Sequence, residues 1–450
     1  TGKVYTLDEV IISASRIEED PSTVGRNVTV ISNEEIENSL HYSLAGLLAE
    51  QESIYMIGNN QTPGSLQQGF LRNSNSSHSV VMIDGVRISD PSTVNNSVDL
   101  SEISLAGIER IEIVRGSHST LYGSSAIGGV INIITKTKGA EGFNLDFSTN
   151  QSVFGADTYA TRNNLMLNVT TSKGYYIDAG FSQKYSNGLD ATIDTVTAPN
   201  SFNPQDRDEF KKLDLIGKAG YKTSDTDIYF SYRNEDQNSD LDQGAYNDDD
   251  NAQVEFSRDL FSYGATHKAF DNFIIGYEGA YSDLSRDFVN DSSLVSSGGA
   301  FDGTYVETNA SGTLWENALT ATITGSNIKS ILGLESSVQT MNSRNYIFSR
   351  SQFGVFEQET DLDSLDLKET INSAFVHAEL NGGLISNTLQ PFSLVVGSRY
   401  ADHNKFGSHI TYELNPKVRL SGSSMVYAAL TTGFNAPSLY QLNTPEQGFG

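Results

Sequence analysis

The spacing of apolar residues divides this chain into two parts near residue 138. Before that point the spacing is mixed, and it predicts a strand at 27–32, a helix from Ser32 to about Ser39, a second helix at 44–49 and a strand with an Asp-Gly turn at 80–88. Ser32 is followed three residues later by Glu35, which is typical of a capping box at the start of a helix. Residues 21–137 therefore predict a small α+β domain.

Residues 110–136, RIEIVRGSHSTLYGSSAIGGVINIITK, end this first part. IEIV and VINIIT are β-branched runs typical of buried strands, and the glycines and serines between them permit tight turns. Gly123 and Gly128 have the spacing of a phosphate-binding loop, but Gly129 and Val130 follow where that loop requires Lys and a hydroxyl residue. The segment therefore predicts a strand, a glycine-rich turn and a second strand.

After residue 138 apolar and polar positions alternate with a period of two, as in YYIDAGFSQKY at 175–185. A membrane-spanning helix needs about 20 successive apolar residues, and no run here approaches that length. A barrel strand needs only about 9 to 11 alternating residues. About 14 such segments, joined by short and long connections in alternation, predict part of a transmembrane antiparallel β-barrel.

Composition excludes several classes of function. The net charge of −27 argues against nucleic-acid binding, which needs clustered Lys and Arg. The absence of Cys excludes disulfides and thiolate metal sites. We expect no enzyme, because the seven His are scattered, no nucleophile elbow is present, and the paired Asp residues lie in polar loops.

Aspartates cluster in two long connections of the predicted barrel, between 187 and 210 and between 234 and 253. Clustered carboxylates on facing loops supply the six to eight oxygen ligands that calcium prefers. No run has the EF-hand spacing, so a site would be built across loops. Solvated loops that keep the surface soluble explain the same pattern.

Two other kinds of segment are candidates for binding. Residues 58–68 and 88–99 are amide-rich loops suited to hydrogen-bonding a large polar ligand, although turn formation explains their composition equally well. Residues 1–20 predict a mobile polar arm with one extended piece, in which Val10 and Ile12 alternate. Such a piece can add a strand to a partner's sheet edge, while a frayed terminus or a strand packed on the first domain fits the same pattern.

Four blocks of sequence resemble the TonB-dependent outer-membrane receptors: LDEVIISASR at 7–16, VVMIDGVRI at 80–88, the block at 110–136 and TTGFNAPSLYQL at 431–442. The first resembles the TonB box and the arm after it, the next two resemble the plug signatures, and the last resembles a late barrel strand and its turn. Within the family, the chain is most similar to the cobalamin (vitamin B-twelve) transporters.

The resemblance implies a mainly β fold in three parts: a TonB box and arm at 1–20, an α+β plug domain at 21–137 in the lumen, and the N-terminal part of a barrel at 138–450. Barrels of this family close with 22 strands, so we expect this sequence to continue in a longer protein. The implied location is the outer membrane of a Gram-negative bacterium, where the barrel contacts lipid.

The resemblance also implies a function, namely TonB-dependent import of a scarce large nutrient. Cobalamin is the expected substrate, and a ferric siderophore or haem is the alternative. Other classes fit less well, because a passive porin needs neither the arm nor the plug signatures. The implied partners are TonB in the periplasm and the nutrient itself, while a surface lipoprotein stays open.

Three sets of residues follow from the resemblance. The TonB-binding set is Leu7, Asp8, Glu9, Val10, Ile11 and Ile12. The substrate-binding set is Ser65, Leu66, Gln67, Gln68, Asn95 and Asn96. The set expected to bind calcium is Asp190, Asp206, Asp208, Asp240, Asp242, Asp249 and Asp250.

Overall fold

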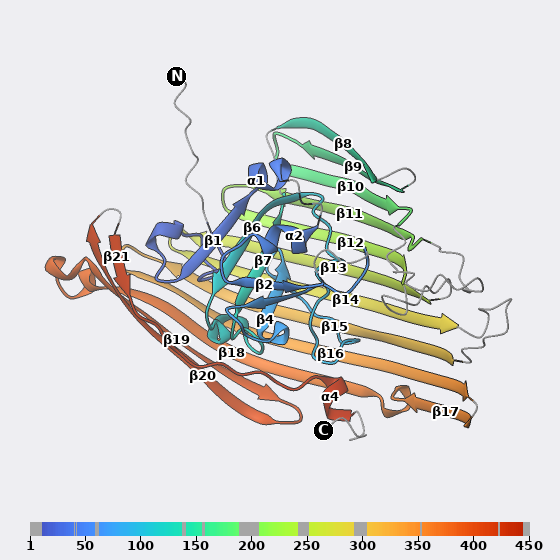
Figure 1. The fold of residues 1–450 in the computed structure, drawn as a ribbon. Coiled ribbons are helices and arrows are strands. Elements are labelled where there is room, and N and C mark those ends of the chain that lie inside the picture. Colours follow the sequence, from blue (N-terminus) through green and yellow to red (C-terminus); the bar gives the residue numbers. More distant parts are fainter. Residues whose placement is uncertain are drawn as a thin grey trace.

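The computed structural model describes residues 11–39, 41, 43–58, 63–136, 141–154, 158–188, 207–241, 252–291, 304–351, 353–421 and 424–443. A small α+β domain, in blue and teal in Figure 1, lies against one face of a long antiparallel sheet that runs from green to red. The predicted fold class, mainly β with an N-terminal plug, is confirmed. No helix among the residues described is both long and apolar enough to cross a membrane.

The plug contains the elements η1 (Pro21–Thr23), β1 (Asn27–Ser32), α1 (Asn33–Asn38), α2 (Leu44–Ala49), β2 (Ile54–Ile57), β3 (Gln68–Leu71), η2 (Ser76–His78), β4 (Ser79–Ile83), β5 (Val86–Ile88), β6 (Ile108–Arg115), α3 (Ser119–Tyr122) and β7 (Gly129–Thr135). Its main sheet has the order β1-β6-β7-β4-β5, and β2 pairs with β3 in a separate hairpin. Only β4 and β7 are parallel. Leu44, Leu48, Ile111, Ile113 and Ile133 are fully buried and form the centre of its core.

Both predicted helices are confirmed. The Ser32 hydroxyl accepts from the Glu35 amide at 3.3 Å, and the Glu35 carboxylate accepts from the Ser32 amide at 2.7 Å, so the capping box starts α1. The LAGLLA segment forms α2, whose N-cap is Ser43. The Asp-Gly turn joins β4 to β5 with positive φ at Asp84 and Gly85.

The glycine-rich turn between β6 and β7 contains an element that the sequence did not predict. Residues 119–122 form the short helix α3, and all four are buried. β6 and β7 then pair antiparallel, as two strands joined by a turn. The prediction of two strands is confirmed, while the description of everything between them as a turn was incomplete.

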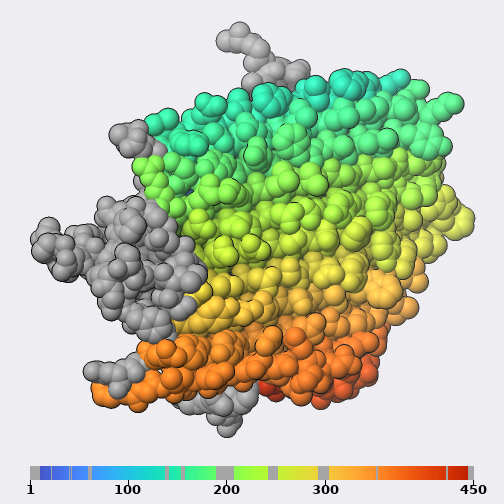
Figure 2. Space-filling model, turned by 90° about the vertical axis from the view of Figure 1, so that its right-hand side faces the viewer, coloured from blue at the N-terminus to red at the C-terminus, as the bar shows by residue number. Residues whose placement is uncertain are grey.

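The large sheet contains β8 (Gly142–Phe154), β9 (Thr158–Thr170), β10 (Tyr175–Ser186), β11 (Phe210–Lys222), β12 (Thr226–Asp240), β13 (Ala252–Phe270), β14 (Phe273–Asp291), β15 (Thr304–Thr324), β16 (Ile328–Ser351), β17 (Gly354–Asp361), β18 (Leu367–Asn381), β19 (Phe392–His403), β20 (Gly407–Ser421), β21 (Ser424–Tyr427) and β22 (Leu430–Thr431). Within the described ranges it has 15 strands, close to the predicted number. β17 and β18 share the partner β16, and β21 and β22 share β20. Figure 2 shows the strands in chain order across one face.

The two faces of this sheet differ in polarity, as the alternation predicted. On β11 Leu213 and Leu215 are 40% and 42% exposed, whereas Lys212 and Asp214 are buried on the other face. On β15 the Trp315 side chain is 51% exposed and Leu314 is buried. An apolar outer face and a polar inner face are the pattern of a barrel wall in lipid.

The late block TTGFNAPSLYQL is not the strand and turn that the resemblance suggested. Only Thr431 of this block is in a strand, and the chain then leaves the sheet to run along the plug. The Phe434 carbonyl accepts from the Ser125 amide at 3.0 Å, and the Ala436 amide donates to the Ser124 hydroxyl at 3.0 Å. The plug turn therefore holds the segment that follows β22. The block ends in helix α4 (Leu439–Asn443).

Gly129 provides a test of plug packing. Its φ is +155°, and an added Cβ would lie 2.3 Å from Leu71 Cδ2 and 2.4 Å from the Val114 carbonyl oxygen. We expect Gly129→Ala to destabilise the plug by about 2 kcal/mol or more, because backbone must move to admit the methyl group. Gly217→Ala is the matched control, since nothing lies within 4 Å of its added Cβ. Chemical denaturation of both variants measures the difference, and equal stability would contradict this packing.

Candidate functional site

The arm is packed on the plug from residue 11 onward, which corrects the prediction of a mobile segment. Ile11 is fully buried, and its backbone forms two 2.9 Å hydrogen bonds with Glu19. The buried carboxylate of Glu112 on β6 accepts from the amides of Ile12 at 3.0 Å and Ser13 at 2.8 Å. A buried carboxylate needs such donors, and these two backbone amides supply them. The other predicted TonB-binding residues lie outside the described residues: Leu7, Asp8, Glu9 and Val10.

We expect Glu112→Gln to loosen the arm, because an amide group is a weaker acceptor for the two backbone amides. In the folded receptor, trypsin should cleave after Arg16 several-fold faster in this variant than in the unmodified protein. Glu109→Gln is the control, because Glu109 is 45% exposed and pairs with Arg110 at 3.2 Å. Equal cleavage rates in the two variants would show that Glu112 does not hold the arm.

The two predicted substrate loops lie side by side at one end of the plug. The Gln67 amide donates to Asp99 Oδ1 at 2.9 Å, and Gln68 Nε2 donates to Ser97 Oγ at 2.5 Å. The Leu100 amide donates to the Gln67 carbonyl at 2.9 Å. These bonds join the two loops that carry the predicted set, which is Ser65, Leu66, Gln67, Gln68, Asn95 and Asn96. We call these joined loops, residues 63–68 and 88–99, the apex.

Different members of this set meet solvent to different extents. Leu66 is 49% exposed, whereas Gln67 is buried with its amide on Asp99. Asn95 is half-buried and donates to Asn75 Oδ1 at 3.3 Å, and Asn96 has a φ of +57°. Leu66 and Asn95 therefore reach solvent at the apex, while Gln67 holds the two loops together.

A buried ionic cluster, which no sequence pattern predicted, fixes the base of the apex. Arg286 on β14 pairs with Asp90 at 2.6 Å and with Glu102, so one barrel arginine contacts both ends of the segment 90–102. Arg258 on β13 contacts Glu102 and Glu235, each at 3.2 Å. No local pattern links β13 and β14 to a plug loop, since these residues meet only in the folded protein.

Burial raises the pKa of two carboxyl groups at the base of the apex. The pKa of Glu102 rises to about 8, although the positive charge of Arg286 opposes this change. Burial also raises the pKa of Asp99, whose charged form is favoured by the amides of Gln67 and Ser101. The negative charges at the base of the apex therefore depend on their arginine and amide partners.

Arg286 should accordingly position the apex. We expect Arg286→Ala to weaken ligand binding by about tenfold or more, because Asp90 and Glu102 lose a shared partner and the segment between them is released. Arg344→Ala is the control, because Arg344 also pairs with a carboxylate, Glu359 at 2.7 Å, but both side chains are about half exposed. Titration of the two receptors with the same ligand measures the effect, and equal affinities would show that Arg286 has no such role.

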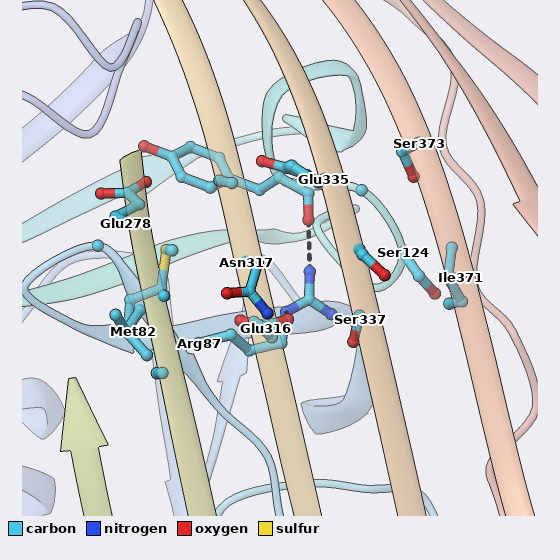
Figure 3. A pocket seen from close by; sticks show the side chains of 18 of the residues that line it. Met82, Arg87, Ser124, Glu278, Glu316, Asn317, Glu335, Ser337, Ile371 and Ser373 are labelled. Carbon is cyan, nitrogen blue, oxygen red and sulfur yellow. Dashed lines mark hydrogen bonds and ion pairs between the residues drawn. The ribbon is translucent and has the colours of Figure 1, made fainter. Parts of the chain in front are cut away.

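A small cavity of about 80 Å³ lies between the plug and strands β14–β16, β18 and β19. Figure 3 shows Glu278, Glu316 and Glu335 on three neighbouring strands around it, with Arg87 of the plug reaching among them. Arg87 lies 3.7 Å from Glu316, and Arg399 pairs with Glu335 at 2.5 Å. Ligand sites typically measure about 300–1,000 Å³, so this space admits only a few water molecules.

The predicted calcium set is described at two of its seven positions. Asp208 precedes β11 and Asp240 ends β12, and the Asp240 amide donates to the carbonyl of Glu209 at 3.0 Å. These two carboxylates therefore belong to the same end of adjacent strands, as a site built across loops requires. The others lie outside the described residues: Asp190, Asp206, Asp242, Asp249 and Asp250. Within the described part of the chain, no group of three or more Asp, Glu or His could hold a metal ion.

A plug held against the polar inner face of a long antiparallel sheet defines a plugged outer-membrane receptor. This chain belongs to the TonB-dependent receptor family. Residues 20–130 match the family model of the TonB-dependent receptor plug domain, and residues 201–449 match that of the TonB-dependent receptor-like β-barrel. Members of this family lie in the outer membrane of Gram-negative bacteria and are receptors and transporters, not enzymes.

Relatives of known identity agree on the fold. A vitamin B12 transporter, BtuB, from Photobacterium profundum is 29% identical over 285 residues, which are 53% of this chain and 45% of the relative. The ferric citrate transporter FecA superimposes with a TM-score of 0.72 at 14% identity, over 94% of this chain and 65% of FecA. The siderophore receptor PiuA from Acinetobacter baumannii gives 0.68 at 17% identity, over 97% and 68%. This chain thus spans less than half the length of the curated relative that it matches.

Proposed function

We propose that this receptor imports a scarce large nutrient across the outer membrane in a TonB-dependent manner, and that the nutrient is cobalamin. The observation that supports import is the plug itself. It packs against the barrel wall, and the cavity between the two at strands β14–β16, β18 and β19 measures only about 80 Å³, so a large ligand cannot pass there without movement of the plug.

The arm supplies the means for such movement. Ligand binds the apex, and TonB in the periplasm captures Leu7 to Ile12 by strand addition. Ile11 and Ile12 must first leave the plug, because Ile11 is fully buried and the Ile12 amide is bonded to Glu112. Force on the captured segment then reaches the plug through the next residue, Ser13, whose amide donates to Glu112 at 2.8 Å.

Cobalamin is supported by the similarity to the vitamin B12 transporter at 29% identity. A ferric siderophore is the second candidate, because the structural neighbours include the ferric citrate transporter FecA and the siderophore receptor PiuA. These neighbours are only 14% and 17% identical to this chain, so the similarity supports the fold and does not identify the substrate. The common end of β11 and β12, with Asp208 and Asp240, supports a calcium site in the adjoining loops.

Calorimetric titration of the full-length receptor with cyanocobalamin tests both the substrate and the metal. We expect binding in calcium and an affinity lower by about tenfold or more after chelation, because calcium would order the ligand-binding loops. The double variant Asp208→Asn, Asp240→Asn should show the weak affinity even in calcium.

Ferric citrate titrated in parallel separates the two candidate substrates. Absence of cyanocobalamin binding with and without calcium would exclude cobalamin, and binding of ferric citrate would then favour the second candidate. Tight binding of cyanocobalamin that is independent of calcium would exclude only the metal site.

A further inference from the structure

The turn that joins β18 to β19 is longer than its neighbours at the same end of the sheet. It has ten residues, 382–391, and contains two short 3-10 helices, η5 (Gly382–Leu384) and η6 (Asn387–Leu389). The other described connections at this end, none longer than four residues, are 171–174, 223–225, 271–272 and 325–327. The long turn is the orange segment that projects at the left of Figure 1. Short turns suffice to join barrel strands at the periplasmic end, so the added length has another cause.

This end of the sheet faces the periplasm. The opposite end carries the long connections 187–209, 241–251 and 292–303, and in outer-membrane barrels the long connections are extracellular. The arm packs at the same end as the turn, since its Glu19 pairs with Lys329 of β16 at 3.0 Å. The Asn381 amide donates to the Asn327 carbonyl at 2.9 Å, which ties the long turn to this part of the wall.

The turn is apolar where its neighbours are polar. Its sequence, GGLISNTLQP, contains no charged residue. The Ile385 side chain is 83% exposed, and Leu384 and Leu389 are also exposed. Three of the four shorter turns carry a charged residue, namely Lys173, Asp225 and Asp271. Exposed apolar side chains that are grouped in this way mark a contact surface.

The exposed side chains continue the lipid-facing side of the wall. In the strand register Ile328 of β16 lies opposite Leu380 of β18, which lies opposite Leu394 of β19. Leu394 is on the same face of β19 as Phe392, which directly follows the turn and is 51% exposed. At about 3.3 Å per residue, Gly382 is about 7 Å beyond this apolar row. The turn therefore begins at the rim of the apolar band of the wall.

The backbone of the turn is suited to an apolar environment. The amides of Ile385 and Ser386 donate to the Gly382 carbonyl at 3.0 and 3.1 Å. Asn381 Nδ2 donates to the Gln390 carbonyl at 3.0 Å and joins the two ends of the turn. Backbone groups that meet lipid must be satisfied within the protein, and these bonds satisfy several of them.

We propose that residues 382–391 are a membrane anchor, which inserts Leu384 and Ile385 among the phospholipids of the periplasmic leaflet. Interfacial apolar segments lie about 5–10 Å within the boundary of headgroups and acyl chains, a depth within reach of a turn at the rim of the apolar band. Continuity with Phe392 and with the apolar row on β16, β18 and β19 favours lipid over a protein partner. The anchor holds in place the section of wall on which the arm is packed.

Residues 1–450 contain no Cys, so a single added Cys can report on this turn. In a full-length receptor otherwise free of Cys, Ile385→Cys is labelled with the fluorophore NBD, and one receptor is placed in each phospholipid nanodisc. A lipid that carries a nitroxide near its headgroup should quench this label several-fold more than aqueous iodide does. Ser326→Cys is the matched control, because Ser326 is exposed in the polar turn 325–327 at the same end. We expect the opposite order of quenching at that position.

Two results would overturn the anchor. Quenching of both positions by iodide, with no effect of the nitroxide lipid on the label at position 385, would show that the turn faces water. Protection of position 385 only after addition of the periplasmic domain of TonB would show that the turn binds protein instead of lipid. A second copy of the receptor cannot cause the protection, because each nanodisc holds one receptor. The proposed import function does not depend on this result, since the anchor involves no nutrient.

Discussion

A cluster of buried charges joins the plug to the barrel wall, and the rest of the structure depends on this contact. Glu102 is fully buried and is held by Arg258 and Arg286 from two barrel strands. A buried carboxylate without such partners would cost several kcal/mol, so the plug can dock only where the wall supplies cations. The same contacts fix the base of the apex through Asp90. This one ionic cluster therefore sets both the position of the plug and the shape of the apex.

A polar contact of this kind suits a domain that must move. Water can replace the partners of a displaced carboxylate or amide, whereas a displaced apolar core exposes surface with no compensating interaction. The main apolar core of the plug lies around Ile111 and Ile133. The plug meets the wall through ion pairs, such as Asp84 with Lys218 at 2.9 Å, and through a smaller apolar cluster that includes Ile331 and Phe375 of the wall. The domain can then shift as a unit while its sheet stays intact.

Local patterns predicted the elements that depend on neighbours in the chain. The capping box of Ser32 and Glu35 predicted α1, and the alternation at 175–185 predicted β10 and its two faces. These features need only contacts within a few residues or a fixed period of two. The helix α3 was missed because its four residues carry no cap hydrogen bond from a side chain, and tertiary packing buries them all.

The sequence by itself determined the fold class, the division near residue 138 and the composition of the apex loops, because each depends on periodicity or on local turn chemistry. Only the tertiary structure decided where the charges meet. It bound Ile12 and Ser13 to Glu112 and placed Arg286 between Asp90 and Glu102. These pairs come from segments far apart in the chain, and pairing across such distances is fixed by register and docking, which no local pattern encodes.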